Sequence, residues 1–254
     1  MIPFNLMKAE GGKTAYIDTG AWSDKAIKEA QRLGTTDIVA SSKDKNYNYI
    51  PKGYHIGSGY DYVHCTSNNT IFGTQMKDFP KVDAPLICDM SSDILSRQLD
   101  FAQFDMIYAG VQKNMGPAGA TMIAVKKSIL GQSGHNIPAY LDLEQHIKND
   151  SMYNTPSVFA VYTSMLTLEW LDAQGGVAAI EKLNQAKANL LYNEIDSNPL
   201  FKGTTEIEDR SPMNATFVLT NEAAHKEAFD GLCKDAGISQ LAGHRSVGGY
   251  RASM

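Results

Sequence analysis

The stretch DMIYAGVQKNMGPAGATMIAV, residues 105–125, decides the fold that this chain can adopt. Its two continuous apolar runs, 106–111 and 120–125, are typical of strands that are covered on both faces of a sheet. Lys113 lies between them, at the start of a turn rich in glycine and proline. A sheet that buries these two runs therefore has to accommodate a lysine at the end of one of them.

Lys113 has two interpretations. Most lysines are solvated surface residues, and this one could be ordinary in the same way. Here, however, apolar strands flank it, and the glycine-rich turn leaves room beside the backbone. An amine that is desolvated has a lowered pKa and can form a Schiff base with a carbonyl compound.

Working outward from this stretch, strand-like and helix-like segments alternate through the first two thirds of the chain. A helix is predicted over 22–34, with Ser23 as its N-cap and Gly34 as its stop. Strands are predicted over residues 14–20, 36–42, 60–67, 84–92, 104–110 and 120–127. This order indicates an α/β sheet.

The pattern changes from Asn154 onward. Two helices are predicted over 154–176 and 177–198, and the first has Pro156 in its first turn, where proline is tolerated. A strand at 214–220, a helix at 223–237 and a closing segment at 244–253 follow, which is an α+β pattern. We therefore predict a large domain over 1–175 and a smaller α+β domain over 176–254.

Composition narrows the class of protein. The 254 residues carry a formal net charge of -5 without any run of lysine or arginine, which argues against nucleic-acid binding. No segment has the length or apolarity of a membrane span, and the start lacks the features of a signal peptide. Three widely spaced cysteines argue against a disulfide framework or a zinc site, and favour the cytoplasm.

Polar residues end several of the apolar runs. Ligands of open α/β sheets bind at the carboxyl ends of the strands, so Thr70, Asp89, Gln112 and Lys113 become candidates for one crevice. Asp89 could simply cap the turn that follows it. It could equally be a partly buried carboxylate that faces a cationic ligand atom, and the pattern alone leaves both interpretations open.

Two further segments have a structural and a functional interpretation. In NTPS, residues 154–157, Thr155 could be a helix N-cap, or its hydroxyl and the helix N-terminus could bind phosphate. Trp22 could be a core residue, or it could offer its ring to a flat ligand.

GHRSVGGYRAS, residues 243–253, holds His244, Arg245 and Arg251 around a glycine pair. These could be ordinary basic residues of a surface loop. Two arginines and a histidine also suit the recognition of two anionic groups, such as a carboxylate and a phosphate.

Taken together, five segments resemble the phosphoserine aminotransferase family, which consists of fold-type I, class V pyridoxal-phosphate transaminases. They are YAGVQKNMGPAG, CDMSSDILSR, GHRSVGGYRAS, TSNNTIFGT and HIKNDSMYNTPSVFAVY. The resemblance covers essentially the whole chain. It implies a large domain with a mixed, mostly parallel sheet and a smaller C-terminal α+β domain.

The resemblance also implies a role for each strand-end residue. Lys113 would hold pyridoxal 5'-phosphate as a Schiff base and then act as the acid and base of the reaction. Asp89 would keep the pyridine nitrogen protonated, and Trp22 would stack on the ring. Thr70 would bond near the hydroxyl of the ring, and Gln112 would contact the phosphate.

The remaining candidates are implied to bind a neighbouring subunit's cofactor or the substrate. Asn154 and Thr155 would reach the cofactor phosphate of the neighbouring subunit, which implies a homodimer with shared active sites. His244, Arg245 and Arg251 would bind the substrate, with Arg251 on the α-carboxylate and the other two nearer the phosphate. No metal is implied.

The implied reaction converts glutamate and 3-phosphohydroxypyruvate into 2-oxoglutarate and phosphoserine, as in serine biosynthesis. Phosphohydroxythreonine, of vitamin B6 biosynthesis, is a related substrate. The family has an early arginine and a phosphate-binding loop before the segment that matches MIPFNLM, and it continues past RASM, so we expect a chain truncated at both ends. The alternatives are a catalytically impaired fragment and another class V enzyme, such as an alanine–glyoxylate aminotransferase.

Overall fold

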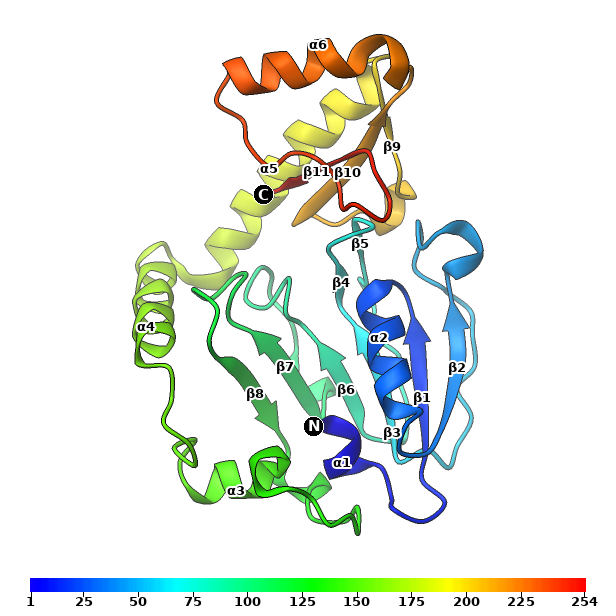
Figure 1. The fold of residues 1–254 in the computed structure, drawn as a ribbon, viewed down its shortest axis with the longest axis vertical. Helices are drawn as coiled ribbons and strands as arrows, with labels where there is room; N and C mark the ends of the chain where they lie inside the picture. Colours follow the sequence, from blue (N-terminus) through cyan, green and yellow to red (C-terminus); the bar gives the residue numbers. More distant parts are fainter.

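The main sheet has six strands in the order β2-β1-β3-β6-β7-β8 in a computed structural model that describes residues 1–254 (Figure 1). The first five are parallel and β8 is antiparallel to β7, with Met106 paired to Val125 and Gly110 to Thr121. The strands are β1 (Lys13–Asp18), β2 (Thr35–Ser41), β3 (Tyr62–Thr66), β6 (Leu86–Asp89), β7 (Met106–Gly110) and β8 (Thr121–Val125). The prediction of a mixed, mostly parallel sheet is confirmed.

The central strands are buried on both faces, because successive side chains point to opposite sides of a strand. Along β1, Ala15 and Ile17 pack into a core on one face, while Tyr16 packs into a second core on the other. The edge strands differ. In β2, Ile38 keeps 50% of its surface exposed, so the expectation of strands covered on both faces is wrong for that edge.

Helices cover one face of the main sheet. The helix α2 (Ala21–Ala30) places Ile27 and Ala30 in the core that contains Tyr16, together with residues of α1 (Ile2–Leu6) and α3 (Leu143–Lys148). Its N-cap is Gly20, so the prediction of Ser23 as N-cap is wrong. The Ser23 hydroxyl instead accepts hydrogen bonds from the backbone N–H groups of Thr19 and Gly20, both at 2.9 Å.

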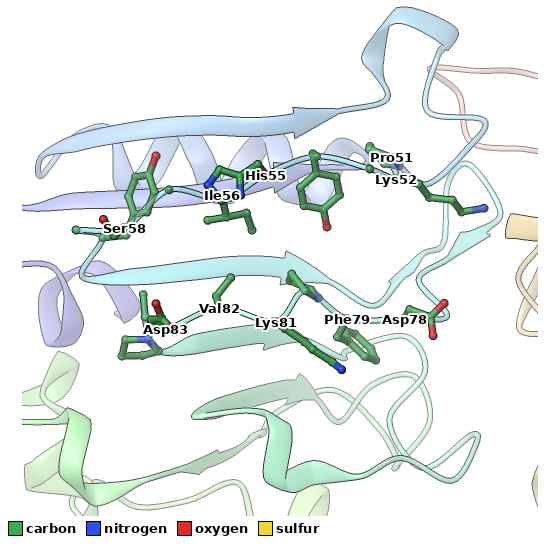
Figure 2. A pocket seen from close by; sticks show the side chains of 18 residues that line it. Pro51, Lys52, His55, Ile56, Ser58, Asp78, Phe79, Lys81, Val82 and Asp83 are labelled. Carbon is green, nitrogen blue, oxygen red and sulfur yellow. The ribbon is translucent and has the colours of Figure 1, made fainter.

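Two extended connections cover the opposite face. Residues 51–60 and 78–85 flank a groove of about 980 Å³ (Figure 2). Tyr54 and Phe79 pack from these connections against the core beneath them. The first connection contains one proline and three glycines and the second contains two prolines, which explains why neither forms a helix.

A second, antiparallel sheet has the strand order β11-β10-β9. It lies above the carboxyl ends of the parallel strands, with α5 and α6 beside it (Figure 1). The helices and strands after residue 157 are α4 (Val158–Ala173), α5 (Gly176–Ser197), β9 (Phe201–Gly203), β10 (Asn214–Leu219), α6 (Glu222–Asp235) and β11 (Tyr250–Ser253). The core beside the smaller sheet is aromatic, with the Phe217 ring centroid 5.5 Å from that of Tyr250 and 6.5 Å from that of Phe229.

Two details of the secondary structure differ from the expectation. The helix α4 begins at Val158 with Ser157 as N-cap, so the interpretation of Thr155 as N-cap is wrong. The sequence also did not predict β9, nor the short hairpin β4 (Asn68–Asn69) and β5 (Thr74–Gln75). The division into domains 1–175 and 176–254 stays a prediction. No helix has both the length and the apolarity needed to cross a bilayer.

Ile17→Ala tests the packing of the main sheet. Ile17 is fully buried in β1, so its truncation should lower the free energy of unfolding by about 2–5 kcal/mol. Ile38→Ala is the matched control on the neighbouring edge strand and should change the free energy of unfolding by less than about 0.5 kcal/mol. Chemical denaturation measures both values, and equal losses for the two variants would contradict this description of the core.

Candidate active site

Lys113 lies just beyond the carboxyl end of β7, at the edge of the main sheet that faces the smaller sheet (Figure 1). Its Nζ donates a hydrogen bond to Thr70 Oγ1 at 3.2 Å. The same Nζ lies 5.8 Å from the centroid of the Trp22 ring. Three residues from different parts of the chain, all predicted as site residues, are therefore brought together.

The loop that carries Lys113 is closed by backbone hydrogen bonds. Val111 N–H donates to the Ala120 carbonyl at 3.1 Å, and Gly116 N–H donates back to the Val111 carbonyl at 2.8 Å. Gly119 has a φ of +137°, and a Cβ there would lie 2.9 Å from Ser157 Oγ at the start of α4. The glycine-rich turn thus lets the lysine loop pack closely against α4.

The Lys113 amine has a pKa below the usual range of lysine. Desolvation is the main cause, and the positive charge of Arg251 acts in the same direction, whereas Asp89 raises the pKa. The side chain as a whole remains exposed, but the protein atoms packed around Nζ still remove much of its hydration. The amine is therefore less basic than usual, while the lysine side chain remains exposed.

Asp89 is half-buried at the end of β6, and its Oδ1 accepts a hydrogen bond from Ser91 N–H at 2.9 Å. Its register partner on β7 is Tyr108, whose hydroxyl lies 3.0 Å from Nε2 of His64. The His64 ring stacks on Tyr16 at 4.7 Å between centroids. A largely buried row of side chains, Tyr16 on β1, His64 on β3 and Tyr108 on β7, thus lies behind the carboxylate.

His64 was not predicted from the sequence. Burial lowers its pKa to about 4, against the opposing influence of Asp89, so the ring is neutral near pH 7. Its Nδ1 is buried and has no hydrogen-bond partner. The available signal was a histidine inside the apolar run YVHCT, but its neighbours Tyr16 and Tyr108 are distant in the sequence.

Gln112 and Asn154 line a single cavity of about 920 Å³ beside this row. His64 and Tyr108 line the same cavity, so it reaches the residues behind Asp89. Thr155 is exposed and does not line it. The structure thus brings together Gln112 and Asn154 of one chain, and it leaves Thr155 outside.

The predicted substrate residues lie on or next to β11. Arg251 pairs with Thr216 of β10, and its buried Nε has no hydrogen-bond partner. His244 Nδ1 lies 2.7 Å from Ser246 Oγ, which stabilises a turn. Arg245 is exposed and forms no ion pair. Of the three, only Arg251 is close enough to affect the charge of Lys113.

Trp22 has 44% of its surface exposed, so it is not the core residue that one interpretation predicted. Its ring also lies 4.3 Å from Nζ of Lys25.

A family model of aminotransferases, described as Aminotransferase class-V, matches residues 1–254. The chain belongs to this family.

Curated and structural relatives of this class-V aminotransferase agree with the family match. A phosphoserine aminotransferase of Flavobacterium johnsoniae is 65% identical over 254 residues, covering the whole chain and 71% of the relative. The structure of phosphoserine aminotransferase from Bacillus circulans subsp. alkalophilus is 42% identical, with a TM-score of 0.95 over 100% of this chain and 71% of that one. A pyridoxal-phosphate-bound phosphoserine aminotransferase of Trichomonas vaginalis is 35% identical, with a TM-score of 0.91 over 99% and 73% of the two chains.

Class-V aminotransferases use pyridoxal 5'-phosphate, and the residues gathered here fit that group. An aldehyde forms a Schiff base with an uncharged amine, and Lys113 provides an amine of lowered pKa. A pyridine ring suits an exposed indole and a carboxylate, which Trp22 and Asp89 provide. The amides of Gln112 and Asn154 offer hydrogen-bond donors in the adjacent cavity.

Competitive acylation of the cofactor-free protein tests the state of the amine. Lys113, with its lowered pKa, should be acylated faster at pH 8 than Lys226, whose pKa is raised by its hydrogen bond to Asp230. The reason is that only the uncharged amine is nucleophilic. Mass spectrometry of the peptides measures both rates, and labelling of Lys113 no faster than that of Lys226 would refute the desolvated amine.

Proposed function

We propose that the protein catalyses transamination between glutamate and 3-phosphohydroxypyruvate, giving 2-oxoglutarate and phosphoserine. The observation that carries the proposal is the pairing of two cationic groups with different environments. The Lys113 amine is desolvated, and Arg251, whose positive charge lowers the pKa of that amine, has a buried Nε that lacks a hydrogen-bond partner. One group is suited to a carbonyl compound and the other to an anion.

Each residue of the crevice has a defined task in this proposal. When bound, pyridoxal phosphate supplies an electron sink for the carbanion that forms at the substrate's α-carbon. Lys113 holds the cofactor aldehyde and later takes and returns the proton at that α-carbon, for which a lowered pKa is required. Asp89 holds a proton on the pyridine nitrogen, and Trp22 covers the ring. Thr70, whose hydroxyl lies 3.2 Å from Lys113 Nζ, orients the amine.

The substrate is bound by β11 and the segment before it. Arg251 takes the α-carboxylate, which would satisfy its unpartnered Nε. His244 and the exposed Arg245 take the second anionic group, the phosphate of phosphoserine or the side-chain carboxylate of glutamate. Gln112 takes the cofactor phosphate, and Asn154 and Thr155 reach the cofactor phosphate of the neighbouring subunit.

A spectroscopic assay of the cofactor-loaded protein tests the substrate. Phosphoserine should convert the visible band of the pigment at least about tenfold faster than serine or alanine, because a charged hydrogen bond contributes about 1.5–3 kcal/mol. Stopped-flow absorbance with each amino acid measures the rates. Equal conversion by alanine would indicate another class-V activity instead.

Lys113→Ala is the companion variant for the cofactor linkage. It should lose the visible band that borohydride reduction removes from the unaltered protein, since Lys113 is the amine of lowered pKa that bonds to Thr70. Lys182→Ala, at an exposed lysine of α5, is the matched control and should keep the band. A reducible band that survives in Lys113→Ala would rule out Lys113 as the attachment site.

The protein acts as a homodimer in the same proposal. One face of α4 packs against the lysine loop through Ala160 and Ser164. The remaining faces expose a set of large apolar side chains, namely Val158, Phe159, Val161, Tyr162, Met165, Leu166 and Trp170. A patch of this kind is typical of a protein–protein interface. Asn154 and Thr155 directly precede α4, so a second copy seated there lies close to both residues.

Phe159→Glu tests this interface. A charge placed on Phe159, which is 69% exposed, should shift the protein from dimer to monomer because its carboxylate would be desolvated at the interface. Leu232→Glu on α6, at a side chain 67% exposed, is the matched control and should stay dimeric. Sedimentation velocity measures the masses, and a monomeric unaltered protein would overturn the dimer.

We also place the protein in the cytoplasm. Cys65 and Cys88 are register partners on adjacent strands, and they and Cys233 are free thiols. Three free thiols and no disulfide suit a reducing compartment.

A further inference from the structure

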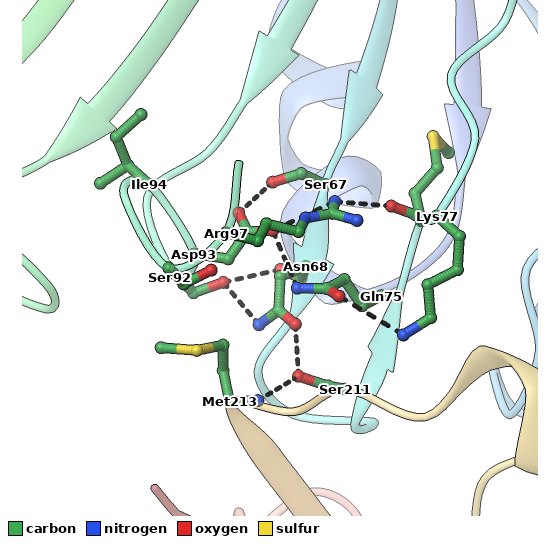
Figure 3. Close-up of polar contacts among 12 residues, drawn as sticks. Ser67, Asn68, Gln75, Lys77, Ser92, Asp93, Ile94, Arg97, Ser211 and Met213 are labelled. Atoms are coloured by element: carbon green, nitrogen blue, oxygen red, sulfur yellow. Dashed lines mark hydrogen bonds and ion pairs between the residues drawn. The ribbon is translucent and has the colours of Figure 1, made fainter. Parts of the chain in front are cut away.

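A buried asparagine joins the main sheet to the smaller one (Figure 3). Asn68 follows β3 and is 2% exposed. Its Nδ2 donates to Ser92 Oγ and to Asn214 Oδ1, both at 2.9 Å, and its Oδ1 accepts from Ser211 Oγ at 2.5 Å. Ser92 belongs to the main sheet's side, whereas Ser211 and Asn214 belong to the smaller sheet's side.

On the smaller sheet's side, these bonds lead to the strand that carries Arg251. Ser211 Oγ accepts from Met213 N–H at 3.0 Å and from Asn214 N–H at 3.1 Å, so Asn68 stabilises the turn that starts β10. Asn214 Nδ2 donates to Ser253 Oγ on β11 at 3.3 Å. The hydrogen-bond path therefore ends two residues from Arg251.

On the main sheet's side, the same asparagine is two residues from Thr70, which accepts from Lys113. Ser92, three residues after Asp89, returns a hydrogen bond from its hydroxyl to the Asn68 carbonyl at 2.8 Å. One side chain thus contacts both the segments that place the cofactor residues and the segment that places Arg251.

The hairpin around Asn68 has a second, independent attachment to the main sheet. Ser67 Oγ donates to Asp93, and Gln75 Nε2 donates to the same carboxylate at 3.1 Å (Figure 3). Arg97 lies 3.6 Å from this carboxylate. Removing the Asn68 side chain therefore leaves the hairpin attached to the main sheet through Asp93. It also leaves the bonds that the Phe72 carbonyl accepts from Thr205 and Thr216, so the change is confined to the side-chain bonds of Asn68 to Ser92, Ser211 and Asn214.

We propose that Asn68 is a positioning residue that sets the separation between Lys113 and Arg251. It makes no contact with the crevice itself, and it acts through Asn214 and the register of β10 with β11. The consequence for the reaction rests on the proposed function: loss of Asn68 should weaken the binding of the substrate carboxylate more than it slows the chemistry at Lys113.

Hydrogen exchange of the cofactor-free protein tests the link without reference to activity. In Asn68→Ala, the amides of Met213, Asn214 and β11 should exchange at least about tenfold faster, because their local opening no longer has to break the bonds that Asn68 makes to Ser211 and Asn214. The control is Asn5→Ala. Asn5 is also buried, but it bonds Leu141 O at 2.8 Å and Leu143 N at 2.9 Å, away from both sheets' junction. It should leave these amides unchanged.

The kinetic arm uses the cofactor-loaded protein. Asn68→Ala should raise the KM for phosphoserine about tenfold, change kcat less than about threefold, and keep the visible band. Asn214→Ala removes the partner on the other side of the junction and should reproduce this pattern, which covers the case in which Asn68→Ala does not fold.

The outcomes separate the two proposals. Uniformly faster exchange across the chain, or unchanged exchange at 213–214 and β11, overturns the positioning role. A fall in kcat with no rise in KM overturns it as well. If the unaltered protein does not act on phosphoserine, the proposed function fails, and the exchange experiment still decides whether Asn68 couples the sheets.

Discussion

Desolvation of the Lys113 amine at the carboxyl end of a buried strand is the constraint on which the rest of the site depends. The amine must lose hydration for its pKa to fall, and it must stay accessible so that a ligand can reach it. The closed loop after β7 meets both needs, because its backbone hydrogen bonds hold the lysine against neighbouring segments without covering it. Asp89 and Arg251 then act on this charge in opposite directions.

The Asp89 carboxylate, which raises the pKa of Lys113, lies next to a row of aromatic and imidazole rings. Tyr16, His64 and Tyr108 lie on three strands of the main sheet, and burial keeps His64 neutral. The polar hairpin after β3 extends the site in the other direction, towards the smaller sheet. The proposed active site is therefore a junction: the main sheet would provide the amine and the carboxylate, and β11 would provide the guanidinium.

Several site residues could be predicted from the chain alone. Thr70, Asp89 and Lys113 follow apolar runs, and the carboxyl ends of parallel strands meet at one edge of a sheet, so their proximity could be expected. Helix starts were predicted less well. Ser23 lies at the third position of α2, where its hydroxyl accepts from the N–H groups of Thr19 and Gly20, so Gly20 is the N-cap. The helix α4 begins at Val158, three residues after Thr155. His64 and Asn68 could not be found, because each depends on partners that are distant in the sequence.

The class of fold, the main alternation of helices and strands and the family could be inferred from the amino-acid sequence, since apolar periodicity and the segments around Lys113, Asp89 and Arg251 are local properties of the chain. The folded chain was needed to show which cations act on one another, which histidine lies near the carboxylate and which asparagine joins the two sheets. The physical reason is that a pKa depends on burial and on charges within a few ångströms. A buried hydrogen bond likewise depends on groups that only the folded chain brings together.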